Sequence, residues 1–380
     1  MKIKYDNEAR RQCFDVNNLA MVQFDEAVKS MKSIINDDFK NITKIIVTGC
    51  GDSYLAAIEA KQAFDKYLKG TACEMVYMRA IDIARFYEFD NEENTLVVAV
   101  SASGGPARIE EILKRSKKNN AIAVALTNNA DSQAAKNADL VYLTNTPDFP
   151  DKMPGLRNYY ASLVSLYVMA ATFGEIKNNK DDYVKKLRAE LFEYNEIFKA
   201  YMQGIDAVAF ATAVDFVEMK GFEVVADSAL NACGRFVAAK YAEVSGDMCS
   251  FIDSESYCHV NTFIRPKHSI GTYAMLLSHD NNINRMVETI NIMLKRDKRS
   301  VLLVSDKKSS EIGISEAVRQ CILPAPKKDY SFLYLLYAYI PGSLAAAYHA
   351  ALINQPYFRG GGVFFDPAIN TLKTNEIKII

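Results

Sequence analysis

Two short runs of small and hydroxyl-bearing residues are the first candidates for chemistry in this sequence. They are Thr48–Tyr54 (TGCGDSY) and Ser101–Ala107 (SASGGPA), and each separates an apolar run from a helix-like run. Small side chains let backbone N–H groups approach an anion, hydroxyls add donors, and a helix N-terminus adds the positive end of its dipole. Together the runs predict a phosphate-binding site, although each run alone is also typical of an ordinary helix cap. Their spacing fits neither GxxxxGKS nor GxGxxG, so a nucleotide is not the expected ligand.

The substrate-binding residues that we expect in these runs are Cys50, Gly51, Asp52, Ser53, Ser101, Ala102, Ser103 and Gly104. The second half of the chain has no comparable pair of runs. Its matching stretches, Asp227–Ala229 and Ser305–Lys307, carry an acid where a phosphate would bind. We therefore expect phosphate binding in the first half and a different task for the second half.

Lys240 and Glu243 are a second candidate pair. They lie three residues apart in a helix-like run, so they share a helix face and can meet one ligand or each other. An ordinary surface ion pair, worth a few tenths of a kcal/mol, is the alternative. His259 suits proton transfer near neutral pH, and His349 is a second candidate because it lies in an apolar helix-like run. The remaining histidines, His268 and His279, are expected to be loop residues without a catalytic role.

Short apolar runs rich in β-branched residues predict the strands that must position these residues. They are Ile45–Thr48, Leu96–Val100, Ala121–Leu126 and Leu140–Leu143 in the first half, and Glu223–Ala226, Tyr273–Leu277, Val301–Val304 and Cys321–Leu323 in the second. Helix-like stretches alternate with these runs at nearly the same spacing in both halves. Such alternation predicts an α/β fold with two parallel sheets, each flanked by helices. Ligands of such sheets bind beyond the carboxyl ends of the strands, where both candidate phosphate runs begin.

The repeat predicts a domain layout along the chain. We expect a helical lead over residues 1–29, a first domain over 30–175, a helical connector over 176–205, a second domain over 206–353 and a tail over 354–380. Residues 332–353 contain no Asp, Glu, Lys or Arg and are long enough to span a bilayer. Because Pro341, Gly342 and Ser343 interrupt them, a buried strand followed by a buried helix is expected instead of a membrane span.

Composition limits the partners and the compartment. The 380 residues carry 45 Lys plus Arg against 46 Asp plus Glu, without the clustered basic excess that nucleic-acid binding requires. The 7 cysteines are scattered without a CxxC pair, which is typical of free thiols in a reducing cytosol. The N-terminal residues lack the apolar core of a signal peptide, so we expect a cytoplasmic protein.

The CGDSY and SASGG motifs, in a chain with two similar α/β halves, resemble the double sugar-isomerase (SIS) domain family of phosphosugar enzymes. That family includes the isomerase half of glucosamine-fructose-6-phosphate aminotransferase and the deglycases of fructoselysine 6-phosphate. The resemblance covers nearly the whole chain and implies two flavodoxin-like domains. It implies that Ser53, Ser101 and Ser103 are phosphate ligands, while Pro106 replaces a threonine that also binds phosphate in relatives.

The same resemblance implies the catalytic residues. Relatives carry a Lys and a Glu three residues apart and a His sixteen residues after the Glu, and Lys240, Glu243 and His259 match this spacing. Glu243 would be the general base, and Lys240 would hold it and neutralise the enaminolate. His259, donated by the other subunit of a homodimer, would open the sugar ring. Arg157 stands where relatives have a Lys, and it would either line the mouth of the site or form a surface salt bridge. No metal or organic cofactor is needed for this chemistry.

The sequence departs from the aminotransferase around His259 and in the tail. The aminotransferase has GELKHGP around its histidine, whereas FIDSESYCH here is more similar to the deglycase segment that ends in EFRH. The tail YFRGGG also resembles the deglycase tails. The catalytic tail Lys of the aminotransferase has no counterpart, since Arg359 lies near its place and Lys373 lies well beyond it. With only a short helical lead before residue 30, glutamine-dependent synthesis is not expected of this chain alone.

These features predict a ketosamine-6-phosphate deglycase. It would cleave a substrate such as fructoselysine 6-phosphate, through an enaminol and an imine, into an aldose 6-phosphate and a free amine. An amino-sugar-6-phosphate deaminase or isomerase that releases ammonia is one alternative. A non-catalytic phosphosugar-sensing module is the other, although such a protein has no reason to keep the three catalytic residues at this spacing. No motif identifies the amine.

Overall fold

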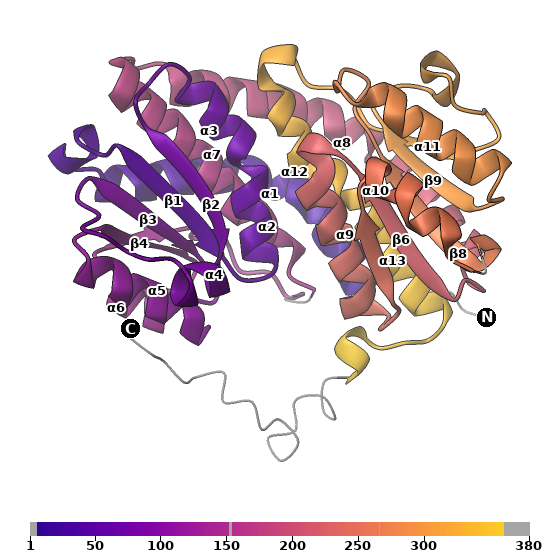
Figure 1. Ribbon diagram of the computed structural model, residues 1–380, viewed down its shortest axis with the longest axis horizontal. Coiled ribbons are helices and arrows are strands. Elements are labelled where there is room, and N and C mark those ends of the chain that lie inside the picture. The colour runs from indigo at the N-terminus through magenta and orange to yellow at the C-terminus, as the bar shows by residue number, and fades with distance from the viewer. Residues whose placement is uncertain (1–5, 152–153, 266, 361–380) are drawn as a thin grey trace. The chain divides into compact units, whose positions relative to one another are not determined.

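The computed structural model describes residues 6–151, 154–265 and 267–360, which belong to two compact units (Figure 1). The first-sheet unit contains residues 18–149 and 157–193. The second-sheet unit contains the described residues of 6–17, 150–156 and 194–360. Each unit is built around a parallel sheet of its own, so each has its own core.

The first sheet has five parallel strands in the order β2-β1-β3-β4-β5. They are β1 (Lys44–Gly49), β2 (Glu74–Arg79), β3 (Thr95–Val100), β4 (Ile122–Thr127) and β5 (Leu140–Leu143). Apolar side chains of α4 (Ala80–Arg85), α5 (Ala107–Lys118) and α6 (Gln133–Asn137) pack on one face of the sheet. Figure 1 shows α1 (Glu8–Ile34), α2 (Asp52–Glu59), α3 (Lys61–Tyr67) and α7 (Leu156–Asn178) on the other side.

The second sheet also has five parallel strands, in the order β10-β9-β8-β6-β7. They are β6 (Gly221–Ala226), β7 (Cys249–Ile252), β8 (Ile270–Met275), β9 (Ser300–Ser305) and β10 (Arg319–Ile322). Side chains of α10 (Ser254–His259) and α11 (Ile283–Lys295) pack on one face. On the other, α9 (Asn231–Val244) packs on β6 and β7, and α13 (Ile340–Leu352) packs on α9. The long helix α8 (Tyr183–Asp215) precedes this sheet in the chain.

The two sheets repeat one topology. When both are read from the edge formed by their second strand, the orders β2-β1-β3-β4-β5 and β7-β6-β8-β9-β10 correspond strand by strand. The duplicated α/β fold predicted from strand spacing is therefore confirmed. The loops after β1 and β3 in the first sheet correspond to the loops after β6 and β8 in the second.

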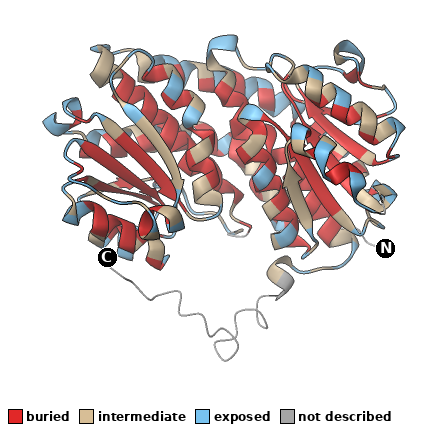
Figure 2. Ribbon diagram, in the orientation of Figure 1, coloured by how far each residue is buried: buried red, intermediate tan, exposed pale blue. Residues whose placement is uncertain are grey.

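The strands predicted from apolar runs are confirmed, but β2 and β7 were missed. Both are edge strands, and none of their residues is fully buried (Figure 2). A partly exposed strand does not need a continuous apolar run, and β7 (CSFI) has none of useful length. The strand β2 (EMVYMR) does contain an apolar run, Met75–Met78, so the same signal could have found it.

The strand expected at the start of residues 332–353 is wrong. This segment is helical instead, comprising the end of η6 (Lys328–Tyr334), then α12 (Leu335–Ala338) and α13. Pro341 lies in the first turn of α13, where proline is tolerated, so it begins a buried helix and does not interrupt one. Within the described residues no helix is both long enough and apolar enough to cross a membrane.

Candidate functional site

The two candidate phosphate loops begin side by side at the carboxyl edge of the first sheet. Strands β1 and β3 are direct neighbours, and Gly49 at the end of one is paired with Val100 at the end of the other. Cys50 and Ser101 therefore leave the sheet next to each other. The first loop leads into α2 and the second into α5, so both loops carry the N-terminus of a helix.

The serine hydroxyls in these loops are oriented by backbone amides. The Ser101 Oγ, which is buried, accepts a hydrogen bond from the Gly104 N–H at 3.1 Å. The Ser103 Oγ, which is exposed, accepts one from the Gly105 N–H at 3.4 Å. Because each oxygen acts as an acceptor, the hydroxyl hydrogen can still donate to a phosphate oxygen. Ser53 is half-buried in the first turn of α2, and its role as a phosphate ligand stays a prediction.

Gly104 is required by the conformation of the second loop. Its φ is +62°, and a Cβ at this position would overlap the Ser132 side chain. Neighbouring carbonyls fix the same loop, because the Ala102 oxygen accepts the Asn128 N–H at 2.9 Å and the Gly104 oxygen accepts the Ala134 N–H at 3.0 Å. The loop is thus held on both sides by β4 and α6 before any ligand binds.

Arg157 lies in the first turn of α7 and is buried. Its Nη1 donates to the Pro147 carbonyl at 2.9 Å, and its guanidinium lies 4.5 Å from the centre of the Phe149 ring. These contacts hold the segment that follows β5. A role at the mouth of the site stays a prediction for this residue.

The loops of the second sheet are occupied by carboxylates of the protein itself. Asp227, directly after β6, accepts hydrogen bonds from the Ser254 N–H at 2.8 Å and from the Asn282 amide at 2.5 Å. The expectation that Ser305–Lys307 matches the second phosphate run is wrong, because this stretch follows β9, the counterpart of β4, and the matching loop is the one after β8. Asp306 reaches that loop and accepts from the Ser278 N–H and hydroxyl, each at 2.7 Å. An internal carboxylate therefore takes donors that an external anion would need, which explains physically why the acids noted in the sequence replace a phosphate site.

Lys240 and Glu243 are in contact in the last turns of α9. The Lys240 Nζ lies 2.6 Å from the Glu243 Oε2, and their side chains are 1% and 29% exposed. Lys240 also donates to the Pro154 carbonyl at 3.4 Å and lies 4.5 Å from the centre of the Phe236 ring. A buried lysine that meets a partly exposed carboxylate differs from the ordinary surface ion pair that helix spacing alone suggests. The contact orients Glu243 while leaving part of its carboxylate accessible.

His259 ends α10 on the surface of the second-sheet unit. Its side chain is 70% exposed, and its Nε2 is 2.9 Å from the Glu255 Oε1. Arg285 pairs with the same carboxylate at 2.7 Å. No hydrogen bond joins His259 to Lys240 or Glu243 in the part of the chain that the structure describes. Glu255 was not singled out from the sequence, although its i, i+4 spacing from His259 was a usable signal.

His349 has a packing role in this unit. It is buried on α13, its Nε2 is 3.0 Å from the Asp247 Oδ2, and its ring meets the Phe222 ring edge-on at 4.9 Å. Burial lowers the pKa of His349, and the opposing effect of Asp247 is smaller. His349, packed against the rings of Phe222 and Tyr241, therefore fastens α13 to the turn after α9.

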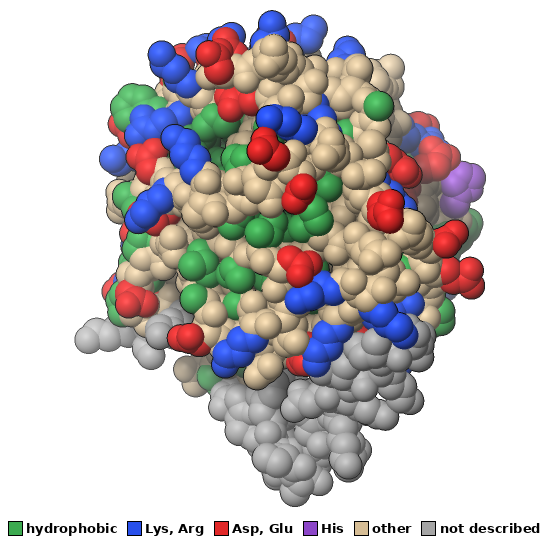
Figure 3. All heavy atoms as spheres, turned by 90° about the vertical axis from the view of Figure 1, so that its left-hand side faces the viewer, with side chains coloured by type: hydrophobic (Ala, Val, Ile, Leu, Met, Phe, Trp, Pro, Cys, Tyr) green, Lys and Arg blue, Asp and Glu red, His purple; other side chains and the backbone are tan. Residues whose placement is uncertain are grey.

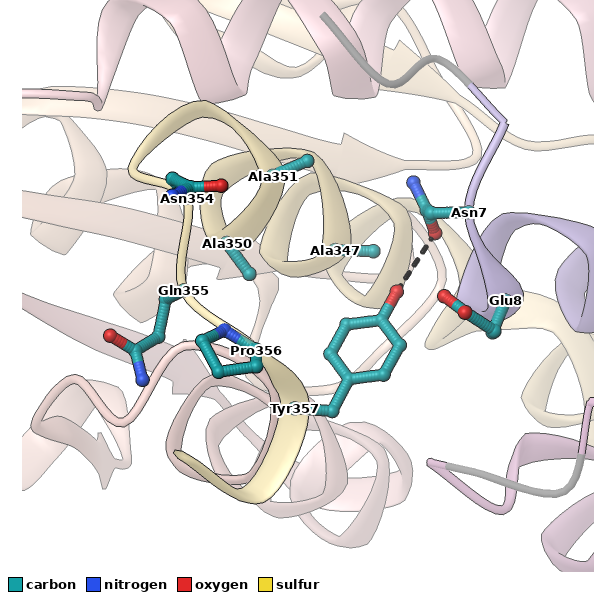
Figure 4. A pocket seen from close by; sticks show the side chains of 9 residues that line it. All are labelled: Asn7, Glu8, Ala347, Ala350, Ala351, Asn354, Gln355, Pro356 and Tyr357. Carbon is teal, nitrogen blue, oxygen red and sulfur yellow. Dashed lines mark hydrogen bonds between the residues drawn. The ribbon is translucent and has the colours of Figure 1, made fainter. Parts of the chain in front are cut away.

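A cavity of about 450 Å³ lies in the second-sheet unit, and the close-up in Figure 4 shows the side chains that line it. One wall is η7 (Tyr357–Gly360), which packs against α9, and there the Tyr357 hydroxyl donates to the Asn7 Oδ1 at 3.1 Å. The lining offers the Glu8 carboxylate, amides and a phenol, and none of the described lining residues is Lys, Arg or His. Such a lining suits a neutral or cationic polar group, so we do not assign the phosphate to this cavity.

Two tail residues named from the sequence have no described side chain. Arg359 belongs to η7, of which only the backbone is described at this position, and Lys373 lies outside the described residues. The replacement of the missing tail lysine by either residue stays a prediction.

A family model described as the SIS domain matches residues 38–172. Residues 38–172 of this chain are therefore similar to an SIS domain. This region holds the whole first sheet and both candidate phosphate loops, so the resemblance stated from the CGDSY and SASGG motifs is confirmed there.

Curated relatives include two enzymes named glutamine–fructose-6-phosphate aminotransferase [isomerizing]. The one from Thermococcus kodakarensis is 27% identical over 190 residues, which are 48% of this chain and 30% of that protein. The one from Clostridium acetobutylicum is 25% identical over 169 residues, which are 43% of this chain and 26% of that protein. The chain therefore matches less than a third of the length of either relative.

Solved structures show the same fold over almost the whole chain. The C-terminal domain of glucosamine-fructose-6-phosphate aminotransferase from Francisella tularensis has a TM-score of 0.78 at 19% identity, over 93% of this chain and 98% of that chain. Glucosamine-6-phosphate deaminase from Thermotoga maritima has a TM-score of 0.65 at 14% identity, over 93% and 97%. The duplicated architecture is thus shared with these proteins.

Proposed function

We propose that the protein is a phosphosugar-processing enzyme of the isomerase or deaminase type, and that its substrate is a ketosamine 6-phosphate. The contact between buried Lys240 and partly exposed Glu243 carries the proposal. It supplies an oriented carboxylate beside a cation, which proton abstraction next to a carbonyl requires. Relatives named as aminotransferase and deaminase act on 6-phosphates of sugars, by their names, which supports the substrate class.

The phosphate is assigned to the loops after β1 and β3. The hydroxyls of Ser53, Ser101 and Ser103, together with the N-termini of α2 and α5, offer donors without any basic side chain. One phosphate can be bound in this way by a chain whose net charge is -1. We assign no phosphate to the loops of the second sheet, because Asp227 and Asp306 already accept hydrogen bonds from backbone N–H groups there.

The proposed reaction begins with ring opening by proton transfer at the ring oxygen, which is assigned to His259. Glu243 then removes a proton from C1 of the open-chain ketosamine and gives the enaminol. Return of that proton to C2 gives the imine of the aldose. Water adds to the imine carbon and the C–N bond breaks, so aldose 6-phosphate and a free amine leave. Lys240 stabilises the negative charge that develops after the first proton transfer.

The position of His259 supports a site shared between two copies of the chain. This exposed histidine is followed by the apolar side chains of Val260, Phe263 and Ile264, all of which are exposed, Phe263 by 78%. Large exposed apolar groups beside a catalytic candidate are typical of an interface. We therefore propose that the protein is a homodimer in which His259 of each subunit completes the active site of the other subunit.

A coupled assay tests the proposal. The protein is incubated with fructoselysine 6-phosphate, and glucose 6-phosphate and free lysine are measured. The Glu243→Gln variant is expected to lower kcat by roughly 10²–10⁴-fold, because a general base contributes about that much. His349→Gln is the matched control, since this histidine has a packing role. Full activity of Glu243→Gln would refute the assignment of the base.

Parallel substrates separate the related activities. Glucosamine 6-phosphate and galactosamine 6-phosphate are run under the same conditions, and ammonia is measured. Ammonia from either compound, without amine from the ketosamine, would make the protein an amino-sugar-6-phosphate deaminase. Saturable binding of these phosphates with no turnover of any would instead identify a phosphosugar sensor.

A further inference from the structure

The segment that carries His259 is fastened to buried charged groups of the second sheet. We call residues 254–264 the His259 segment; it comprises α10 and the short helix η3 (Asn261–Phe263). At its start, the Ser254 N–H and hydroxyl donate to Asp227 at 2.8 and 2.5 Å. In its middle, the Tyr257 hydroxyl donates to the Asp297 Oδ2 at 2.8 Å. The exposed histidine therefore belongs to a segment that is held by hydrogen bonds to two buried carboxylates.

The ion pair between Glu223 and Arg299 is the deepest of these attachments. The Arg299 Nη1 lies 2.6 Å from the Glu223 Oε2, and the two side chains are 0% and 1% exposed. Glu223 belongs to β6, the inner strand next to the edge strand β7, and the Arg299 Nη1 also donates to the Thr272 Oγ1 on the central strand β8 at 3.1 Å. The pair therefore sits inside the sheet, next to the face that α10 covers.

Both members of the pair touch the His259 segment. The Asn261 amide, two residues after His259, donates to the Glu223 Oε1. The Arg299 guanidinium lies 5.1 Å from the centre of the Tyr257 ring, two residues before His259. Residues on both sides of His259 in the chain thus contact the same buried ion pair.

Stability alone does not account for this pair. Removing two charges from water costs several kcal/mol per ion, and well-packed apolar residues of similar volume are often at least as stabilising. The arrangement is also incomplete, because the Arg299 Nε and Nη2 are buried without a hydrogen-bond partner among the described residues. A costly, incompletely satisfied pair that is buried within the sheet is instead explained by the directional hydrogen bond to the His259 segment, which apolar groups cannot make.

We propose that Glu223 and Arg299 are positioning residues for His259, acting through Asn261 and Tyr257. The inference rests on the proposed function, in which His259 transfers a proton to or from the sugar ring. Proton transfer depends on placement within about half an ångström, so a fixed segment serves it directly. The ion pair fixes the position and orientation of the segment that carries the exposed histidine.

The Asn261→Ala variant tests the inference without breaking the buried pair. It removes the one contact by which Glu223 reaches the flank of the histidine. We expect kcat for the ketosamine phosphate to fall roughly 10- to 100-fold with KM changed less than about twofold, as misplacement of a reacting group predicts. Hydrogen exchange is expected to become faster in the peptide covering residues 254–264 and to stay unchanged in peptides of α11.

Ser250→Ala is the matched control. The Ser250 hydroxyl donates to the same Glu223 Oε1 at 3.4 Å, but it belongs to β7 and not to the His259 segment. This variant is expected to keep wild-type kcat and wild-type exchange in residues 254–264. Equal losses in both variants would mean that the pair only stabilises the fold, and that result would overturn the inference.

The two proposals can fail separately. A wild-type protein that turns over none of the phosphosugars refutes the proposed function, and hydrogen exchange still decides the attachment. Unchanged exchange in Asn261→Ala would overturn the positioning role whether or not the protein is active. Unchanged kcat in an active Asn261→Ala protein would overturn it as well.

Discussion

Glu59 is a buried acid at the end of α2, the helix that begins in the first phosphate loop. Burial raises the pKa of Glu59 to about 8, although a hydrogen bond from the Tyr159 hydroxyl opposes this. The side chain therefore keeps its proton in the folded protein at pH values where the unfolded chain loses it. Glu243 differs from it in being partly exposed and paired with a lysine, and this difference separates a structural acid from a candidate base.

The raised pKa predicts that stability falls as pH rises. A carboxyl that ionises near 4.5 when unfolded and near 8 when folded contributes its full stabilisation below the first value. That contribution decreases by at most about 1.4 kcal/mol per pH unit up to the second value. Glu59→Gln should remove this slope between pH 5 and 8. Urea unfolding of both proteins at four pH values measures it, and identical slopes would contradict the burial argument.

Each candidate phosphate loop connects a strand to a helix, so its conformation depends on both of these elements. The second loop depends on Gly104, whose positive φ and tight approach to Ser132 exclude a side chain. Its ends are fixed by Val100 on the sheet and by α5, so a change of conformation at one position affects all the donors together. Loops of this kind lose ligand affinity before the sheet beneath them unfolds.

We expect Gly104→Ala to destabilise the protein by about 1–3 kcal/mol, the usual cost of a strained backbone conformation, and to raise KM for the phosphosugar. Gly155→Ala is the control, because its φ of +81° imposes a similar strain while, apart from its chain neighbours, no described atom lies within 4 Å of the added Cβ. Denaturant unfolding and initial rates distinguish the two variants. An unchanged KM in Gly104→Ala would argue against phosphate binding at this loop.

At the scale of the whole molecule, charge is balanced. On the face seen in Figure 3, Lys and Arg are interspersed with Asp and Glu, in keeping with the net charge of -1. A surface on which the two signs of charge alternate does not produce the positive electrostatic potential that attracts a polyanion. A single phosphate bound by loop amides does not depend on such a potential. The proposed homodimer would therefore depend on apolar contacts such as those around His259 and not on long-range electrostatic attraction.

Mixing two inactive variants tests the shared site. Glu243→Gln and His259→Asn each lack one essential group, and in a homodimer with shared sites a mixed dimer regains one intact site. Random exchange of subunits would restore about a quarter of wild-type activity, because half of the dimers are mixed and each has one of two sites. Sedimentation of Phe263→Asp, expected to be a monomer, is the independent measurement. No recovery after subunit exchange would place His259 in the site of its own chain.

The fold could be read from the sequence where residues are fully buried on both faces of a sheet. Runs such as Leu96–Val100 need apolar side chains at every position, so their pattern identifies them. Edge strand β7 has no such requirement and was missed. The apolar stretch after residue 332 was misread because a short buried strand and a buried helix carry the same composition.

The sequence by itself determined the duplicated α/β architecture, the phosphate loops as candidates and the helical spacing of Lys240 and Glu243. These depend on local order along the chain, on burial periodicity, turn chemistry and helix repeat. The tertiary structure alone decided that Lys240 is buried beneath Glu243, that carboxylates occupy the donors of the second sheet, and that Glu223 and Arg299 support the His259 segment. Such contacts join residues far apart in the chain, and they exist only once the strands are aligned in register.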